Sequence, residues 1–207
     1  MTIDIQSLLF VGWFAVFGGL LNVVADWFLL GFPVAGRDIK MEMLAKKPAW
    51  SVRLGAYLAM VAIPMWIAVT VPTAYLLRDA PIFLIVLPLL GIALISIYSL
   101  VYHVSYIFYD AAYRHAPDAV DLLLKEKTFQ TRFMMLVGLA AYAALLAGGI
   151  LSSAPWWWLA ASPIVLQPAF SFAARFAPAP VGGYLLTGAG SLGFTVFALV
   201  TMLAVAI

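Results

Sequence analysis

The sequence contains no cysteine and only two histidines. Without cysteine the chain cannot form disulfides, thiolate nucleophiles, thiol redox relays or Cys-ligated metal sites. His103 and His115 are twelve residues apart, which is ~18 Å along one helix. Two histidines at that separation cannot hold the same ion or the same haem, and zinc sites usually need several protein ligands. We therefore expect neither a metal site nor a cofactor.

Charged residues are also scarce, because they make up 10% of the 207 residues, whereas a soluble domain carries about a quarter. The formal net charge of +2 is too small to suggest a nucleic-acid partner. Hydrophobic residues account for 66% of the chain. No soluble fold of this length could bury that much apolar surface, so lipid must surround most of it.

Six apolar runs are long enough to cross a membrane, which takes about 20 mostly apolar residues. They span residues 8–32, 52–77, 81–110, 129–152, 156–176 and 181–206. The predicted fold is an all-α integral membrane protein, in which residues 1–207 form a single bundle of six transmembrane helices. Met1 to Gln6 contain one acid and no base, which is unlike a signal peptide. The first run is therefore expected to remain as a helix.

The basic residues predict the orientation of these helices. Ten of the eleven lie beside the first, third and fifth connections, and only Arg78 lies at the second. Because basic residues concentrate on the cytoplasmic side, we expect both termini on the non-cytoplasmic side. Short loops and the absence of a targeting segment favour a bacterial inner (plasma) membrane.

Polar residues inside the runs gather in the predicted cytoplasmic half. The first run carries Asn22 and Asp26, on one stripe with small residues. The helix of the third run can extend to His115, past the membrane edge, and it presents one continuous polar face, formed by Ser96, Ser99, His103, Tyr106, Asp110 and Tyr113. The outer half is almost entirely apolar. This distribution predicts a polar pocket inside the bundle, open to the cytoplasm or the inner leaflet and closed on the other side by apolar side chains.

Asp26 and His103 are the candidate catalytic residues. A buried acid beside an imidazole gives two groups whose protonation is coupled, which suits general acid–base catalysis or a proton-coupled carrier. The alternative interpretation pairs Asp26 with Arg53 or Arg175 as a structural acid. Asp110 lies four residues before Arg114, so a surface ion pair is the alternative for that residue.

Further residues are expected to bind or orient a ligand in the same pocket. They are Asn22, Tyr57, Ser99, Tyr106, Asp110, Gln167, Ser171 and Tyr184. No phosphate-binding glycine-rich loop and no serine elbow of the G-x-S-x-G type is present. The glycines around Ser191 in the last run indicate close helix packing.

Two short segments resemble motifs of lysoplasmalogenase-type membrane proteins, which cleave the vinyl ether of lysoplasmalogens. Ala25-Asp26-Trp27-Phe28-Leu29-Leu30-Gly31 is similar to their acid-then-leucines signature, and Tyr102-His103-Val104-Ser105-Tyr106 is similar to their His-x-x-Tyr signature. The chain departs from that family in having fewer helices and a whole extra helix between the two segments. The resemblance implies a lipid-modifying enzyme but does not assign the chain to the family.

Three functions remain open on the sequence. The first is a protein that binds an amphipathic, lipid-like molecule and modifies it by acid–base chemistry. The second is a small proton-coupled transporter built from two inverted three-helix halves, because prolines interrupt the second and fifth runs. The third is an accessory or structural subunit without catalysis. Membrane lipids, a lipid-like ligand and a second copy or partner membrane subunit are the expected partners.

Overall fold

A computed structural model describes residues 4–207, and within them the chain is helical with no strand. Residues 1–3, part of the N-terminal stretch considered above, lie outside the described residues. The long helices are α1 (Ile5–Leu30), α2 (Ala49–Trp66), α4 (Ile82–His115), α5 (Val120–Leu151) and α8 (Val181–Ala206). The shorter α-helices are α3 (Thr70–Leu76), α6 (Trp156–Ala160) and α7 (Pro163–Phe176). Short 3-10 turns occupy η1 (Gly36–Asp38), η2 (Met41–Lys46), η3 (Ile67–Val69) and η4 (Pro117–Ala119).

Five helical segments are long and apolar enough to cross a membrane, counting α2 to α3 as one and η4 with α5 as another. Their outward faces carry large apolar side chains, among them Phe10 at 76% exposure and Leu136 at 68%. A soluble protein rarely exposes so much continuous apolar surface. The prediction of an all-α protein with several helices long and apolar enough to cross a membrane is therefore confirmed.

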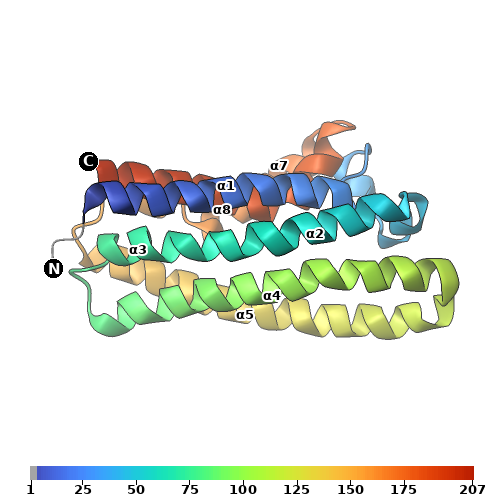
Figure 1. Cartoon of the computed structure of the whole chain (residues 1–207), viewed down its shortest axis with the longest axis horizontal. Helices are drawn as coiled ribbons and strands as arrows, with labels where there is room; N and C mark the ends of the chain where they lie inside the picture. Colours follow the sequence, from blue (N-terminus) through green and yellow to red (C-terminus); the bar gives the residue numbers. More distant parts are fainter. Residues whose placement is uncertain (1–3) are drawn as a thin grey trace.

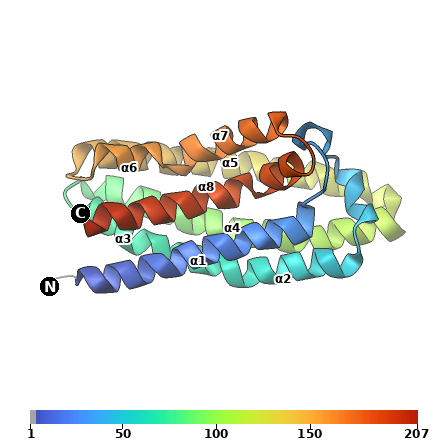
Figure 2. The same cartoon turned by 90° about the horizontal axis from the view of Figure 1, so that it is seen from above.

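The fifth predicted helix, 156–176, is broken into α6 and α7. Proline disfavours the helical conformation for the residue before it, and Ser162, which precedes Pro163, has an extended backbone with ψ of 144°. Neither piece is long enough to span a bilayer alone, although α7 follows α6 along the bundle (Figure 2). The prediction missed this break because the apolar composition continues across it.

Two other boundaries differ by five residues or more from those predicted. The fourth predicted helix begins at Val120 rather than at 129, because the charged stretch before the apolar run is already helical. The third extends to His115 rather than to residue 110. Figure 1 shows that α4 and α5 form a long antiparallel hairpin, which projects further than the other helices at one end of the bundle.

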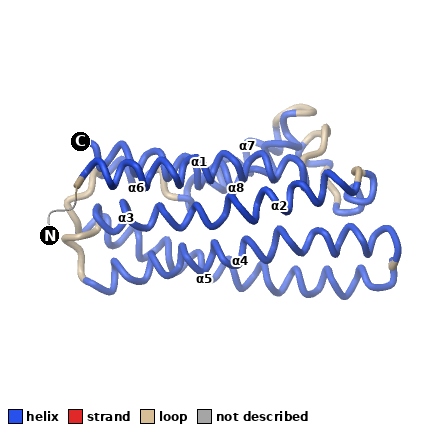
Figure 3. The backbone as a smooth tube through the Cα atoms, in the orientation of Figure 1, coloured by secondary structure: helices blue, strands red, loops and turns tan. Residues whose placement is uncertain are grey.

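Both termini lie at one end of the bundle, and three connections lie at the other (Figures 1 and 3). These connections are the segment between α1 and α2, the α4–α5 turn and the turn before α8. Ten of the eleven basic residues lie in or beside them, and we call this end the basic end.

Helix α1 packs between α2 and α8, and α7 packs on α8. Within the α4–α5 hairpin, α4 is the helix that packs against α2. The half near the termini is filled by large apolar side chains. The rings of Trp66 and Phe194 stack with centroids 4.7 Å apart, and those of Trp158 and Phe197 stack at 5.8 Å. The buried polar side chains of this half include the hydroxyls of Thr73 and Thr201, whereas the buried ionisable residues Asp26, His103 and Asp110 lie toward the basic end.

Candidate functional site

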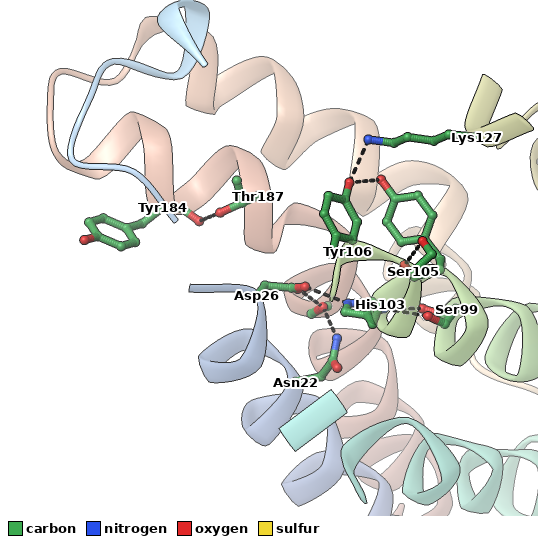
Figure 4. Close-up of polar contacts among 11 residues, drawn as sticks. Asn22, Asp26, Ser99, His103, Ser105, Tyr106, Lys127, Tyr184 and Thr187 are labelled. Carbon is green, nitrogen blue, oxygen red and sulfur yellow. Dashed lines mark hydrogen bonds and ion pairs between the residues drawn. The ribbon is translucent and has the colours of Figure 1, made fainter. Parts of the chain in front are cut away.

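Asp26 of α1 and His103 of α4 meet inside the bundle. The Asp26 Oδ1 and His103 Nε2 atoms are 2.8 Å apart, and the two residues are only 5% and 6% exposed. They are 77 positions apart in the chain, so the tertiary fold alone brings them together. Figure 4 shows the two side chains pointing toward each other from their helices.

The partners of the imidazole fix where its protons lie. His103 Nδ1 lies 2.6 Å from the backbone carbonyl of Ser99, one turn earlier on α4. A carbonyl oxygen only accepts hydrogen bonds, so Nδ1 must carry a proton. The contact between Nε2 and Asp26 Oδ1 then contains exactly one more proton. The pair is either a neutral acid beside a neutral imidazole or a carboxylate beside an imidazolium, and its net charge is zero in both states.

The second carboxylate oxygen of Asp26 accepts a hydrogen bond from the Ser191 hydroxyl of α8. Ser191 in turn accepts a bond of 2.7 Å from the Asn22 side-chain amide. The network therefore runs from Asn22 through Ser191 and Asp26 to His103 and the Ser99 carbonyl, joining α1, α8 and α4. Asn22 Oδ1 is buried and has no hydrogen-bond partner among the residues that the structure describes.

Ser191 is the member of this network that the sequence did not assign to the site. Its neighbours Gly188, Gly190 and Gly193 indicated only close helix packing, and close packing is what brings Ser191 to Asp26. An added Cβ at Gly19 of α1 would overlap the Thr195 hydroxyl of α8. The small residues on the stripe of Asn22 and Asp26 therefore let α8 approach α1 closely enough for a short serine side chain to reach the carboxylate.

The arginines offered as alternative partners do not contact Asp26. Arg53 and Arg175 are both exposed, and the recorded partners of Asp26 are His103 and Ser191. Asp110 instead pairs with Arg114 at 2.7 Å, as the four-residue spacing suggested, although Asp110 is only 6% exposed. Arg114 also donates to the backbone carbonyl of Lys47, so this ion pair ties α4 to the segment between α1 and α2.

The other residues predicted to bind a ligand do not share one pocket. Asn22 and Ser99 belong to the network, Ser99 through its backbone carbonyl. Tyr57 and Gln167 are exposed, and Ser171 is half-buried. In Figure 4 Tyr184 points away from the Asp26–His103 pair, and the Tyr106 hydroxyl points toward Lys127. Sequence spacing placed these residues at a similar depth but did not fix which way each side chain faces.

Lys127 of α5 occupies a cage of tyrosine rings on α4. Its Nζ lies 4.8 to 5.7 Å from the ring centroids of Tyr102, Tyr106 and Tyr109. It also donates a 2.8 Å hydrogen bond to the Tyr106 hydroxyl. A cation over several aromatic faces is stabilised by the ring quadrupoles. This contact locks the α4–α5 hairpin near the basic end.

Lys127→Met should lower the free energy of unfolding by about 2 kcal/mol, since it removes a partly desolvated cation–π contact and keeps most of the apolar stem. Lys125→Met, two residues earlier on an exposed part of the same helix, should change it by less than about 0.5 kcal/mol. Denaturant unfolding in detergent micelles measures both. Equal effects of the two substitutions would mean that the cage contributes nothing.

A separate pocket of about 600 Å³ lies at the basic end of α1. Its lining includes Trp27, Phe32, Lys46, Lys47 and Tyr184. Val24, Trp27 and Phe28 of α1 and its C-cap Gly31 line the pocket and follow the spacing of one helix face. Asp26 is two positions from Val24 and from Phe28, so it lies on the opposite face. The pocket and the Asp26–His103 pair are therefore two distinct features.

Among residues 4–207 no cluster of three His, Asp or Glu side chains could hold a metal ion. Comparisons with protein families, with curated proteins and with solved structures find no match to this chain. Its function has to be inferred from its own residues and their arrangement.

Proposed function

We propose that this protein is a six-pass membrane protein that carries out acid–base chemistry on an amphipathic, lipid-like molecule, with Asp26 and His103 as the proton-transfer pair. The observation that carries the proposal is the 2.8 Å contact between Asp26 Oδ1 and His103 Nε2, two ionisable groups that are both buried inside the bundle. Ionisable residues inside a membrane protein are costly and usually functional.

The proposed topology has both termini on the non-cytoplasmic side, in a bacterial inner membrane, with α6 and α7 together making the fifth of six crossings. The basic end then faces the cytoplasm, in agreement with the positive-inside rule. The pair would lie in the cytoplasmic half of the bilayer. A molecule that reaches it would approach from the inner leaflet, because large apolar side chains fill the other half of the bundle.

Chemically, the pair can give a proton to a substrate atom and take one back without changing its own net charge over the cycle. His103 is oriented by the Ser99 carbonyl, and Asp26 is oriented by Ser191, so both groups are preorganised. The unpartnered Asn22 Oδ1 can accept one hydrogen bond from a substrate hydroxyl or amide. We propose that this atom orients the bound molecule beside the pair.

The test is conversion of membrane lipids by the purified protein. A total lipid extract from bacterial membranes is incubated with the protein, and the species that appear or disappear are followed by mass spectrometry. Asp26→Asn keeps the size and a hydrogen bond to His103 but removes the transferable proton, so conversion should fall by at least 100-fold. Asp118→Asn, an exposed residue beyond the end of α4, should leave conversion unchanged. Full conversion by the Asp26→Asn protein would rule out the proposed role.

A structural or accessory role is the second candidate, and one observation favours it. Both oxygens of Asp26 and both nitrogens of His103 already have partners inside the protein. A fully bonded network of this kind is able to act as a purely structural element, which fixes the packing of α1, α4 and α8. No lipid conversion by the wild-type protein, together with a large loss of stability in pair variants, would favour this role.

The inverted-repeat carrier receives less support. The middle helix of the first three-helix half is divided into α2 of 18 residues followed by α3 of 7. The middle helix of the second half is divided into α6 of 5 residues followed by α7 of 14. An inverted repeat would match α2 with α6 and α3 with α7 in order along the chain. The lengths do not match in this order. Both breaks lie nearer the end of the bundle that holds the termini, whereas inversion would place the two breaks near opposite ends.

A further inference from the structure

The pocket at the basic end of α1 has a lining suited to an anionic group. It contains the two lysines Lys46 and Lys47 and no acidic residue. The Lys46 side chain is exposed and has no hydrogen bond or ion pair with any residue in the described range 4–207. A volume of about 600 Å³ lies within the range of small-molecule sites.

Lys47 has a geometry that leaves one donor available. Its Nζ donates to the backbone carbonyls of Trp27 and Phe28, at 2.8 and 2.7 Å, in the last turn of α1. An ammonium group has three N–H donors, so one remains for a ligand. Burial lowers the pKa of Lys47 from 10.5 to about 8, because the charged form is desolvated there. An anion beside the ammonium would relieve this penalty.

The apolar surroundings continue from the pocket along α1. Phe17, Leu20 and Val24 are 60%, 52% and 37% exposed, and their spacing places them on one face that leads to Trp27. Trp50, at the start of α2, is 61% exposed and lies against Phe28 with ring centroids 6.2 Å apart. Exposed tryptophans beside lysines are typical of the level where the bilayer meets water.

From these features we infer that the pocket binds one anionic phospholipid, with its phosphate at Lys46 and Lys47 and an acyl chain along Phe17, Leu20 and Val24. The lysines and the apolar stripe favour a lipid over free phosphate, because free phosphate would use only the charged part of the site. The inference concerns a site on the opposite face of α1 from Asp26. It does not depend on the proposed acid–base function.

The test compares phosphatidylglycerol with phosphatidylcholine of the same chain length, added to the full-length protein in maltoside micelles. Native mass spectrometry gives the dissociation constant of each lipid. Lys46→Gln should weaken phosphatidylglycerol binding about fivefold, since one lysine near a membrane surface contributes roughly that factor toward an anionic lipid. Phosphatidylcholine, which has no net charge, should be affected much less. Lys40→Gln removes an exposed lysine of the same segment that does not line the pocket, and it should have no effect.

Two results would overturn the assignment of the lipid phosphate to Lys46 and Lys47. One is equal weakening of phosphatidylglycerol binding by Lys40→Gln and Lys46→Gln, which would mean unspecific attraction to the basic end. The other is displacement of bound phosphatidylglycerol by millimolar inorganic phosphate, which would mean a site for the free anion. Phosphatidylglycerol with a photoactivatable diazirine in its acyl chain should label residues 17–24, and labelling confined to other helices would exclude the proposed chain path. The Lys46 side chain bonds no other described residue, so its replacement should leave the fold intact.

Discussion

Replacing either Asp26 or His103 with alanine should destabilise the protein by about 3–5 kcal/mol, and replacing both should cost clearly less than the two single effects added together. Removing one member of a buried pair leaves the other without its partner in a medium of low dielectric constant. Removing both eliminates that penalty, and what remains is the lost packing and the unpaired Ser191 hydroxyl.

The measurement is a double-mutant cycle on Asp26→Ala, His103→Ala and the double variant, by denaturant unfolding in detergent micelles. Ser96→Ala is the control. Ser96 is fully buried on the same face of α4, but among the described residues its hydroxyl bonds only to the Ile92 carbonyl of its own helix, at 2.8 Å. This control should change the free energy of unfolding by about 1 kcal/mol or less. Strict additivity of the two alanine substitutions would show that the pair does not act as a unit.

Gly183→Ala should be the most destabilising glycine-to-alanine substitution in α8, and it should lower the free energy of unfolding by about 1–3 kcal/mol. An added Cβ at Gly183 would overlap the backbone carbonyl oxygen of Phe32 and would lie 2.7 Å from that of Val34. Backbone atoms cannot rotate away, so the segment after α1 would have to shift. The same segment is held by a 2.8 Å hydrogen bond from the Gly183 N–H to the Val34 carbonyl.

Gly188→Ala is the matched control, because it adds the same methyl group to the same helix. Its Cβ would meet the Trp27 Nε1 atom at 3.5 Å and a Val23 methyl at 3.7 Å, which is ordinary contact. Alanine is also favoured over glycine inside a helix by up to about 1 kcal/mol. Gly188→Ala should therefore be neutral or slightly stabilising. Similar losses at both positions would mean that the close approach of α8 to Phe32 is not what requires Gly183.

The Gly183→Ala substitution also reports on the pocket at the basic end of α1, because Phe32, Pro33 and Val34 line it. A shift of this segment should weaken phosphatidylglycerol binding even at temperatures where the variant is still folded. The Asp26–His103 pair lies on the other face of α1 and has its own contacts on α4 and α8. The two sites can therefore be perturbed separately.

The sequence by itself determined that the chain is a membrane protein, because apolar runs of this length would otherwise be exposed to water. It also identified the candidate functional residues. Asp26 and His103 are ionisable groups inside apolar runs, where polar groups are costly, and Asn22 lies on the same stripe as Asp26 at helical spacing. These inferences use only hydropathy and the period of one helix, and both properties can be read along a single segment.

Only the tertiary structure decided which faces meet. Helical spacing defines the face on which a residue lies, but the rotation of each helix is set by packing against its neighbours. That is why Asp26 contacts His103 and Ser191 and not Arg53 or Arg175. It is also why Tyr184 and Tyr106 face away from the pair although they were expected beside it. Ser191 joins the site because small residues bring α8 against α1, and the lysine-lined pocket forms because the segment after α1 folds back on the opposite face. Contacts between helices depend on the fit of two surfaces at once, which no single run of sequence contains.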